Sequence, residues 1–197
     1  MYRSGMEKLP VYSVEEPRWL YKLDANERSA RLSRTVQREI NLRLQNIESR
    51  RYPDMGAVSL KKMLAAAYGL PVEQVTVGNG SSELIAAVCS AFGGQGRPIA
   101  YQWPSFSMYP IYAALADSPA VAIPLDADFH LSASAVLDTV KKDKIKLLIL
   151  CNPNNPTGTL IPSETLREII RQAPCPVLVD EAYHEYVGRE DYASGLT

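Results

Sequence analysis

The sequence is short of cysteine and histidine, and it has neither a long apolar run nor an excess of charge of one sign. Its three cysteines, Cys89, Cys151 and Cys175, are odd in number and widely spaced. We therefore expect buried thiols in a reducing compartment rather than a disulfide framework. The two histidines, His130 and His184, are too few and too far apart to form a metal cluster.

The weak charge and the lack of long apolar runs exclude further classes of protein. The formal net charge is −1 and no basic stripe is present, which argues against a nucleic-acid partner. No apolar run approaches the length of a membrane span, and the charged first ten residues do not form a secretory signal. The 197 residues are 46% apolar, enough to build one sizeable core. We expect a cytoplasmic protein that acts on small molecules.

Short apolar runs and helical segments alternate along most of the chain. Residues 1–35 are polar and irregular, and 34–48 could form a helix. Beyond them, the expected strands are 75–77, 98–101, 120–124, 146–150 and 177–179. The expected helices are 57–68, from Ser81 or Ser82 to about 92, 106–116, from 132 to the lysines at 141–146, and 163–173. This alternation predicts an α/β fold in three layers, with a largely parallel sheet covered by helices on both faces.

Unusual residues follow the first two expected strands, at the edge where parallel sheets bind ligands. Residues 78–82, with the sequence Gly-Asn-Gly-Ser-Ser, join a strand to a helix, and their amides and hydroxyls suit a phosphate. An ordinary helix cap explains this segment equally well. Residues 103–106, with the sequence Trp-Pro-Ser-Phe, offer aromatic rings that could stack on a flat heterocycle, although such rings more often belong to the core.

Polar residues also follow the last two expected strands. Two prolines and a glycine fix the loop at 152–158, which three asparagines line, and a held Asn side chain explains it better than a stiffened turn. Asp180 follows three apolar strand positions, so we expect a partly buried carboxylate that needs a cation or donor. A protonated pyridine nitrogen is one such partner. The alternative is an aspartate that caps the next turn.

With these residues identified, the chain resembles the fold-type I aminotransferases, and among them the histidinol-phosphate aminotransferases, from about Leu23 to Tyr186. The resemblance depends on six motifs in the family's order and spacing. They are Leu-Asp-Ala-Asn-Glu at 23–27, Arg-Tyr-Pro-Asp at 51–54, Val-Gly-Asn-Gly-Ser-Ser-Glu-Leu-Ile at 77–85, Pro-Ser-Phe-Ser-Met-Tyr at 104–109, Cys-Asn-Pro-Asn-Asn-Pro-Thr-Gly at 151–158 and Asp-Glu-Ala-Tyr at 180–183.

The resemblance implies the cofactor pyridoxal 5′-phosphate (PLP) and a role for each matching residue. Gly80, Ser81 and Ser82 would hold the cofactor phosphate at a helix N-terminus. Phe106 would stack on the pyridine ring, and Asp180 would pair with the ring nitrogen.

Four further residues have implied roles. Asn155 and Tyr183 would hydrogen-bond the phenolic oxygen of the cofactor. Tyr52 would reach the phosphate in the neighbouring subunit, which implies a homodimer. Asn26 lies in the arm that folds over the substrate in the family.

The chain departs from the family in one feature that bears on catalysis. The lysine that forms the Schiff base lies in a Ser-x-x-Lys-like segment beyond the Asp-Glu-Ala-Tyr motif, and no such segment occurs before Thr197. We therefore expect an N-terminal arm and helix at 1–50 and a partial PLP-binding large domain at 51–197, incomplete at its C-terminal side and without the small C-terminal domain. We therefore assign no catalytic residue. In the family, the strand that corresponds to 75–77 pairs with a later strand, which we do not find in this chain.

The resemblance implies transfer of an amino group between glutamate and imidazole-acetol phosphate, with a phosphorylated amino alcohol or an amino acid as substrate. A threonine-phosphate decarboxylase is the nearest alternative enzyme. A product without catalytic activity that binds PLP or a phosphate reversibly is a third reading. A plain α/β phosphate-binding module is a fourth, but it leaves Asp180, Tyr183 and the Asn-Pro loop unexplained.

Overall fold

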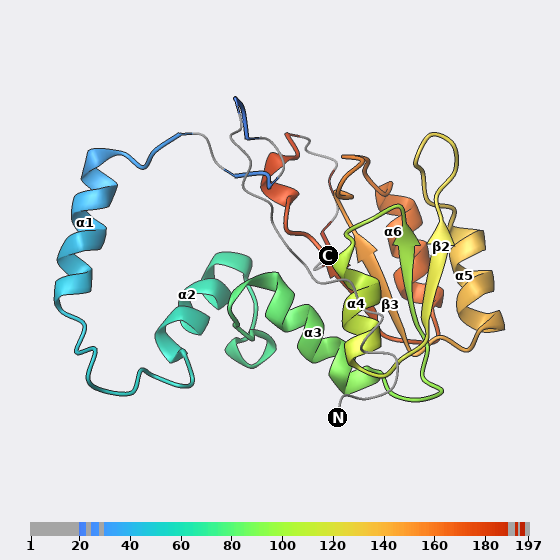
Figure 1. Cartoon of the computed structure of the whole chain (residues 1–197), viewed down its shortest axis with the longest axis horizontal. Helices are drawn as coiled ribbons and strands as arrows, with labels where there is room; N and C mark the ends of the chain where they lie inside the picture. The colour runs from blue at the N-terminus through green and yellow to red at the C-terminus, as the bar shows by residue number, and fades with distance from the viewer. Residues whose placement is uncertain (1–19, 23–24, 28–29, 189–191, 193, 196–197) are drawn as a thin grey trace. The chain divides into compact units, whose positions relative to one another are not determined.

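The protein is described by a computed structural model that covers residues 20–22, 25–27, 30–188, 192 and 194–195. The described residues fall into two compact units, 20–76 and 77–195, and each is considered by itself (Figure 1). Every helix among these residues is too short or too polar to span a lipid bilayer. The same residues contain no group of His, Cys, Asp or Glu side chains arranged to hold a metal ion.

The unit at 20–76 is helical. Its elements are α1 (Arg34–Gln45), α2 (Val58–Tyr68) and the short 3₁₀ helix η2 (Val72–Gln74). Ser33 caps α1 by accepting a hydrogen bond from the N–H of Val36 at 3.3 Å. Gly69 ends α2 with a positive φ of 66°, a conformation that glycine adopts without strain. The helix expected at 34–48 therefore forms but ends earlier, at Gln45.

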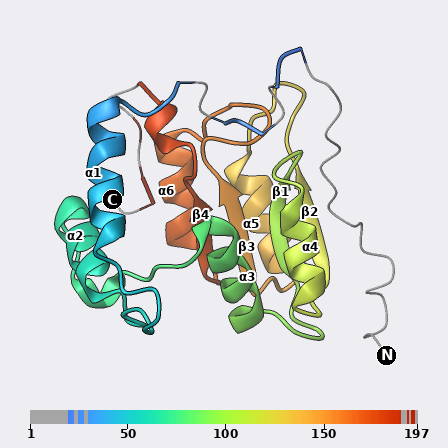
Figure 2. The same cartoon turned by 60° about the vertical axis from the view of Figure 1, so that its left-hand side comes forward.

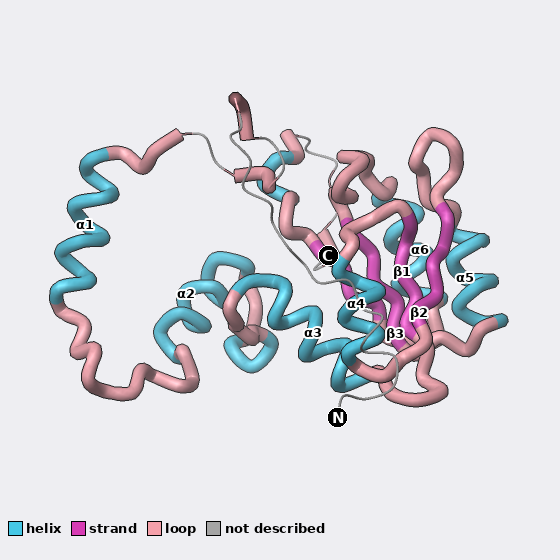
Figure 3. Tube along the Cα trace, viewed as in Figure 1, coloured by secondary structure: helices cyan, strands magenta, loops and turns pink. Residues whose placement is uncertain are grey.

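The unit at 77–195 contains a parallel sheet with helices on both faces (Figure 3). Its strands are β1 (Ile99–Trp103), β2 (Ala120–Pro124), β3 (Leu147–Cys151) and β4 (Val177–Asp180). Its helices are α3 (Gly80–Phe92), α4 (Met108–Leu115), α5 (Ala133–Lys142), α6 (Ser163–Gln172) and the 3₁₀ helix η3 (His184–Tyr186). The strand order is β2-β1-β3-β4, and all three pairings are parallel. The predicted α/β fold is confirmed.

Two apolar cores lie on opposite faces of this sheet. Helices α3 and α4 pack on one face, where Tyr109 and Ile149 are fully buried. Helices α5 and α6 pack on the other face, around Leu148 and Leu150 (Figure 2). All five residues of β3 are buried and apolar, as expected of a central strand covered on both sides.

The strand expected at 75–77 is not formed. Val75 has an extended backbone, with φ −106° and ψ 123°, but residues 75–77 pair with no strand in the described part of the chain. β-branched residues favour an extended backbone, but a strand also needs a neighbour for its N–H and C=O groups. The segment therefore leads to α3 as an extended connection.

Candidate functional site

The carboxyl ends of the parallel strands bring most of the predicted site residues to one edge of the sheet. Phe106 follows β1, Asn155 follows β3, and Asp180 and Tyr183 lie at the end of β4. Ligands bind at this edge in open α/β sheets, because loops and helix N-termini converge there. The edge is the candidate site, and all of these residues belong to the unit at 77–195.

Asp180 is the buried carboxylate that the sequence predicts, with a side chain and backbone only 8% exposed. Its Oδ2 accepts a hydrogen bond from the Tyr109 hydroxyl at 2.8 Å, and its Oδ1 accepts one from the N–H of Ala182 at 3.2 Å. An unpaired buried carboxylate would be costly, so these two donors hold the group in place. One carboxylate oxygen can accept more than one hydrogen bond, which leaves capacity for a cationic N–H donor.

Tyr109 is a site residue that the sequence reasoning did not assign. It is fully buried, and burial raises its pKa, with further contributions from Cys151 and Asp180. The hydroxyl therefore stays protonated and acts as a donor to Asp180. Tyr109 lies three residues after Phe106, a spacing that places both on the same side of a helical turn, and that spacing could have identified it.

Phe106 is half-buried just before α4. Its ring packs edge-on against Tyr109, with ring centroids 5.5 Å apart and an interplanar angle of 84°. Tyr109 therefore fixes both the carboxylate of Asp180 and the orientation of the Phe106 ring. The sequence predicted a stacking role for Phe106, and that role stays a prediction.

The start of α3 differs from the expectation that Ser81 or Ser82 caps this helix. The N-cap is Asn79, so both serines lie in the first turn and are exposed. First-turn amides have no partner within the helix and form the positive end of its dipole. Gly80 has a φ of 77°, and a Cβ at this position would meet no atom within 4 Å, so open space adjoins these amides. Helix starts with such open amides can bind anions, and the predicted phosphate contact at this segment stays a prediction.

A carboxylate already satisfies one donor at this helix start. Glu83 accepts a hydrogen bond from the N–H of Asn79 through a short contact. The Asn79 side chain makes no cap hydrogen bond, so it satisfies none of the first-turn amides. The Ser81 and Ser82 amides remain the donors open to a ligand.

The three asparagines of the loop after β3 have different roles. Asn152 and Asn154 are buried, and both use their side chains within the protein. Asn152 Oδ1 accepts from the N–H of Ile161 at 2.9 Å, whereas its Nδ2 is a buried donor without a partner in the described residues. The Asn155 carboxamide is half-buried and makes no hydrogen bond with the described residues, so it is the amide available to a ligand.

The two acidic residues at the end of β4 also divide their roles. Glu181 binds the segment that follows, because its carboxylate accepts from the Tyr192 hydroxyl, the Ser194 hydroxyl and the N–H of Gly195 at 2.8–3.0 Å. Tyr183 is half-buried, and its ring lies 6.3 Å from that of Tyr186. Asp180 is therefore the member of the pair that faces the candidate site.

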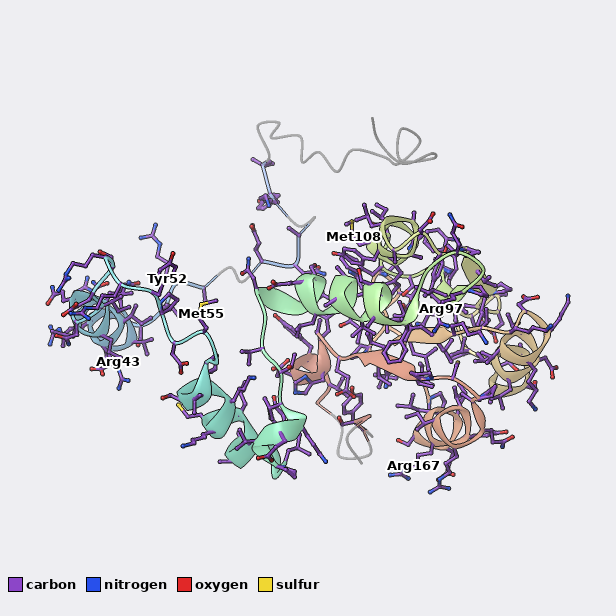
Figure 4. All side chains as sticks on the ribbon, turned by 90° about the horizontal axis from the view of Figure 1, so that it is seen from below. Arg43, Tyr52, Met55, Arg97, Met108 and Arg167 are labelled. Carbon is purple, nitrogen blue, oxygen red and sulfur yellow. The ribbon has the colours of Figure 1, made fainter. Side chains whose placement is uncertain are left out.

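Tyr52 and Asn26 belong to the other compact unit. Tyr52 is 95% exposed on the connection between α1 and α2, and Figure 4 labels it together with Met55 on that connection. Asn26 is also exposed. Their predicted contacts with the phosphate and the substrate stay predictions.

Lysines are absent from the candidate edge in the described residues. Those of the unit at 77–195 lie between the last turn of α5 and the start of β3, at positions 141, 142, 144 and 146. This is the amino end of the strands, opposite the carboxyl end where Asp180 lies. No described side chain at the candidate edge could form an imine with a carbonyl group.

Comparisons with known proteins give matches over most of the chain. A family model described as aminotransferase class I and II matches residues 20–196. The histidinol-phosphate aminotransferases of Caldanaerobacter subterraneus subsp. tengcongensis and Clostridium novyi are 38% and 35% identical to the chain. These matches cover 96% and 95% of the chain but 54% and 53% of the relatives. The chain thus spans about half the length of the curated relatives it matches.

Solved structures show the same fold. The histidinol-phosphate aminotransferase from Sinorhizobium meliloti, in complex with pyridoxal-5′-phosphate, superposes with a TM-score of 0.74 at 22% identity. That match covers 81% of this chain and 43% of the other. The enzyme from Clostridium acetobutylicum gives a TM-score of 0.68 at 26% identity, covering 80% of this chain and 46% of the other.

Proposed function

The chain belongs to the aminotransferase class I and II family, and from this premise we propose that its sheet unit is the PLP-binding part of such an enzyme. The residues fit that cofactor in four respects. The edge offers a buried carboxylate, an aromatic ring, an unpaired carboxamide and open helix N-terminal amides. When bound, PLP supplies an electron sink for chemistry at the substrate Cα.

We propose the following contacts with the phosphate and the ring of the cofactor. The N–H groups and hydroxyls of Ser81 and Ser82, with Gly80, would hold the cofactor phosphate at the start of α3. Phe106 would stack on the pyridine ring. Asp180 would hold the proton on the ring nitrogen, while Tyr109 keeps the carboxylate in place.

The remaining contacts involve the phenolic oxygen of the cofactor and a second subunit. Asn155 and Tyr183 would each hydrogen-bond the phenolic oxygen. Tyr52 would reach the phosphate held by a partner subunit in a homodimer, and Asn26 would lie over the substrate. The division into an arm and helix at 1–50 and a cofactor-binding domain at 51–197 belongs to the same proposal.

The observation that carries the proposal is Asp180, a buried carboxylate at the carboxyl end of β4 with its own donor from Tyr109. A capping aspartate would be exposed and would bond only to the N–H groups of the next turn. Asp180 bonds Ala182 in this way, but Tyr109 in addition fixes it from the neighbouring helix. A carboxylate so held can stabilise a cation at the sheet edge.

The experiment that tests this proposal is a titration of the chain with pyridoxamine 5′-phosphate (PMP), a form of the cofactor that needs no lysine to bind. Asp180→Asn should weaken binding roughly 10- to 100-fold, because a hydrogen bond to a charged group contributes about 1.5–3 kcal/mol. Asp138→Asn, which neutralises an exposed carboxylate on α5, is the matched control and should change nothing. Equal affinities for both variants would exclude the ring contact.

We further propose that this chain, whose described residues place no lysine at the candidate edge, binds PLP reversibly and does not transaminate. Borohydride reduction of the chain with PLP should then yield no adduct on a single specific lysine. A stoichiometric adduct on one lysine would overturn this point and restore catalysis to the chain itself.

We propose that the substrate is a small phosphorylated amino alcohol, histidinol phosphate, in a cytoplasmic enzyme. The sequence identity of 38% and 35% to two histidinol-phosphate aminotransferases supports this choice. The alternative enzyme also has a counterpart of the same fold, an L-threonine-O-3-phosphate decarboxylase from Porphyromonas gingivalis (TM-score 0.65, 22% identity). Turnover of histidinol phosphate with 2-oxoglutarate by a protein that carries this unit and the lysine would support the first, and release of CO₂ from threonine phosphate the second.

A further inference from the structure

The ends of β1 and β3 are joined by side chains rather than by the backbone. The β1–β2 ladder reaches Trp103 and the β3–β4 ladder reaches Cys151, but the β1–β3 ladder already ends at the Tyr101–Ile149 pair. Beyond it, the buried carboxamide of Gln102 replaces the backbone of β1. It donates to the Cys151 carbonyl at 3.0 Å and accepts from the Cys151 N–H at 3.3 Å.

Asn154 forms a second bridge just beyond this point. Its side chain is almost fully buried, at 3% exposure. Its Oδ1 accepts from the Ser105 hydroxyl at 2.7 Å, and its Nδ2 donates to the Pro104 carbonyl at 3.0 Å and to Thr157 Oγ1 at 2.8 Å. One carboxamide thus joins the loop after β1 to the loop after β3.

The bridge lies between two proposed ring contacts. Phe106 directly follows Ser105, and Asn155 directly follows Asn154. We propose that Asn154 is a positioning residue that sets the Phe106 ring and the Asn155 carboxamide at the separation the pyridine ring requires. This inference rests on the proposed function, and it assigns Asn154 no contact with the cofactor.

The bridge requires a carboxamide and not merely a side chain of that size. Aspartate has the same shape but cannot donate, and it would set a carboxylate oxygen against the Pro104 carbonyl, which can only accept. Alanine removes both the Oδ1 acceptor and the Nδ2 donor, and it leaves the buried Ser105 hydroxyl without its acceptor. Both substitutions should release the two loops from each other.

The test is a titration of the variants Asn154→Ala, Asn154→Asp and Ser105→Ala with PMP, in which tryptophan fluorescence reports binding. Ser118→Ala is the matched control, because Ser118 is also buried and hydrogen-bonded, to the N–H of Gly94 at 2.8 Å, but lies before β2 at the opposite edge of the sheet. The Asn154 variants should bind PMP about tenfold more weakly than the wild-type chain, as the loss of a buried hydrogen bond implies. Ser118→Ala should bind within twofold of the wild-type chain.

Competition by inorganic phosphate separates positioning from general damage, because phosphate uses only the α3 site. The variants that lose affinity for PMP should keep the wild-type affinity for inorganic phosphate. PMP affinity within twofold of wild type in Asn154→Ala would overturn the inference. An equal loss of PMP and phosphate affinity would also overturn it, since Asn154 would then only support the fold.

A second measurement keeps this inference apart from the proposed function. Without any ligand, Asn154→Asp should accelerate amide hydrogen exchange in residues 104–109 and 153–159 but not in α5. If the wild-type chain binds no PMP, the proposed function fails, and this exchange pattern still decides whether the bridge holds the loops. Unchanged exchange in both segments would refute the bridge itself.

Discussion

Removal of the Tyr109 hydroxyl tests the arrangement of the site most directly. Tyr109→Phe keeps the ring, and with it the packing against Phe106 at 5.5 Å and Tyr101 at 6.3 Å. Only the hydroxyl that donates to Asp180 is lost. Among the described residues, the donor that Asp180 then keeps is the N–H of Ala182 at 3.2 Å, and the aspartate is only 8% exposed.

The structure sets the size of the expected effect. A hydrogen bond to a charged group contributes about 1.5–3 kcal/mol to the free energy of unfolding. A chain of this length shifts its melting temperature by about 2–4 °C per kcal/mol, so Tyr109→Phe should melt roughly 3–12 °C lower. The measurement is urea unfolding followed by circular dichroism, with thermal melting as a check.

Tyr112→Phe is the matched control for this substitution. Tyr112 lies one turn later on α4 and is also buried, but its hydroxyl makes no hydrogen bond with the described residues. It should change the free energy of unfolding by less than about 0.5 kcal/mol. In an Asp180→Asn background, the cost of Tyr109→Phe should fall to about half, because hydrogen bonds to neutral acceptors are about half as strong. A Tyr109→Phe variant as stable as Tyr112→Phe would refute the reasoning.

Three further predictions follow from single residues. Gly80→Ala and Gly96→Ala should each lower the free energy of unfolding by about 1 kcal/mol, because both glycines have a positive φ and open space around them. Only Gly80→Ala should also weaken phosphate binding in a competition titration. Burial raises the pKa of the Cys89 thiol from 9.0 to about 11, so the unfolded chain releases this proton first. The protonated thiol therefore stabilises the fold fully below pH 9, and this contribution is lost between pH 9 and 11. Over that range, urea unfolding should show that the free energy of unfolding falls by about 3 kcal/mol more in the wild-type chain than in Cys89→Ala. Gly93→Ala should cost about 2–4 kcal/mol in the same assay, because its Cβ would lie 2.5 Å from the Cys89 carbonyl, whereas Gly188→Ala, with open space, should cost less than about 0.5 kcal/mol.

The sequence predicted the fold well wherever periodicity determines structure. Unbroken apolar runs such as 147–150 are typical of a strand covered on both faces, and they alternate with helices of ordinary length. The prediction was wrong at 75–77, where the residues favour an extended backbone but no described strand pairs with them. Local preference sets the conformation of a segment, whereas a ladder depends on what lies beside it.

The candidate site was predictable in position but not in its internal connections. The strand ends indicated Asp180 and the Asn-Pro loop, because parallel strands place these residues at one edge. The sequence could not reveal that Tyr109 donates to Asp180, since that hydrogen bond joins residues 71 positions apart. Nor could it predict that Asn154 would be buried in a bridge while Asn155 stays available, because the two neighbours are chemically identical.

The two cores of the sheet unit differ in how freely they could be redesigned. Helices α3 and α4 carry the proposed phosphate-binding turn and Tyr109, so a repacked residue on their side would shift groups that the proposed site requires. Helices α5 and α6 cover the other face around Val136, Leu166 and Ile169. Stabilising substitutions, such as better cavity filling or new surface charge pairs, could therefore accumulate there. The face of the four-stranded sheet covered by α5 and α6 should therefore accept more substitutions than the face covered by α3 and α4.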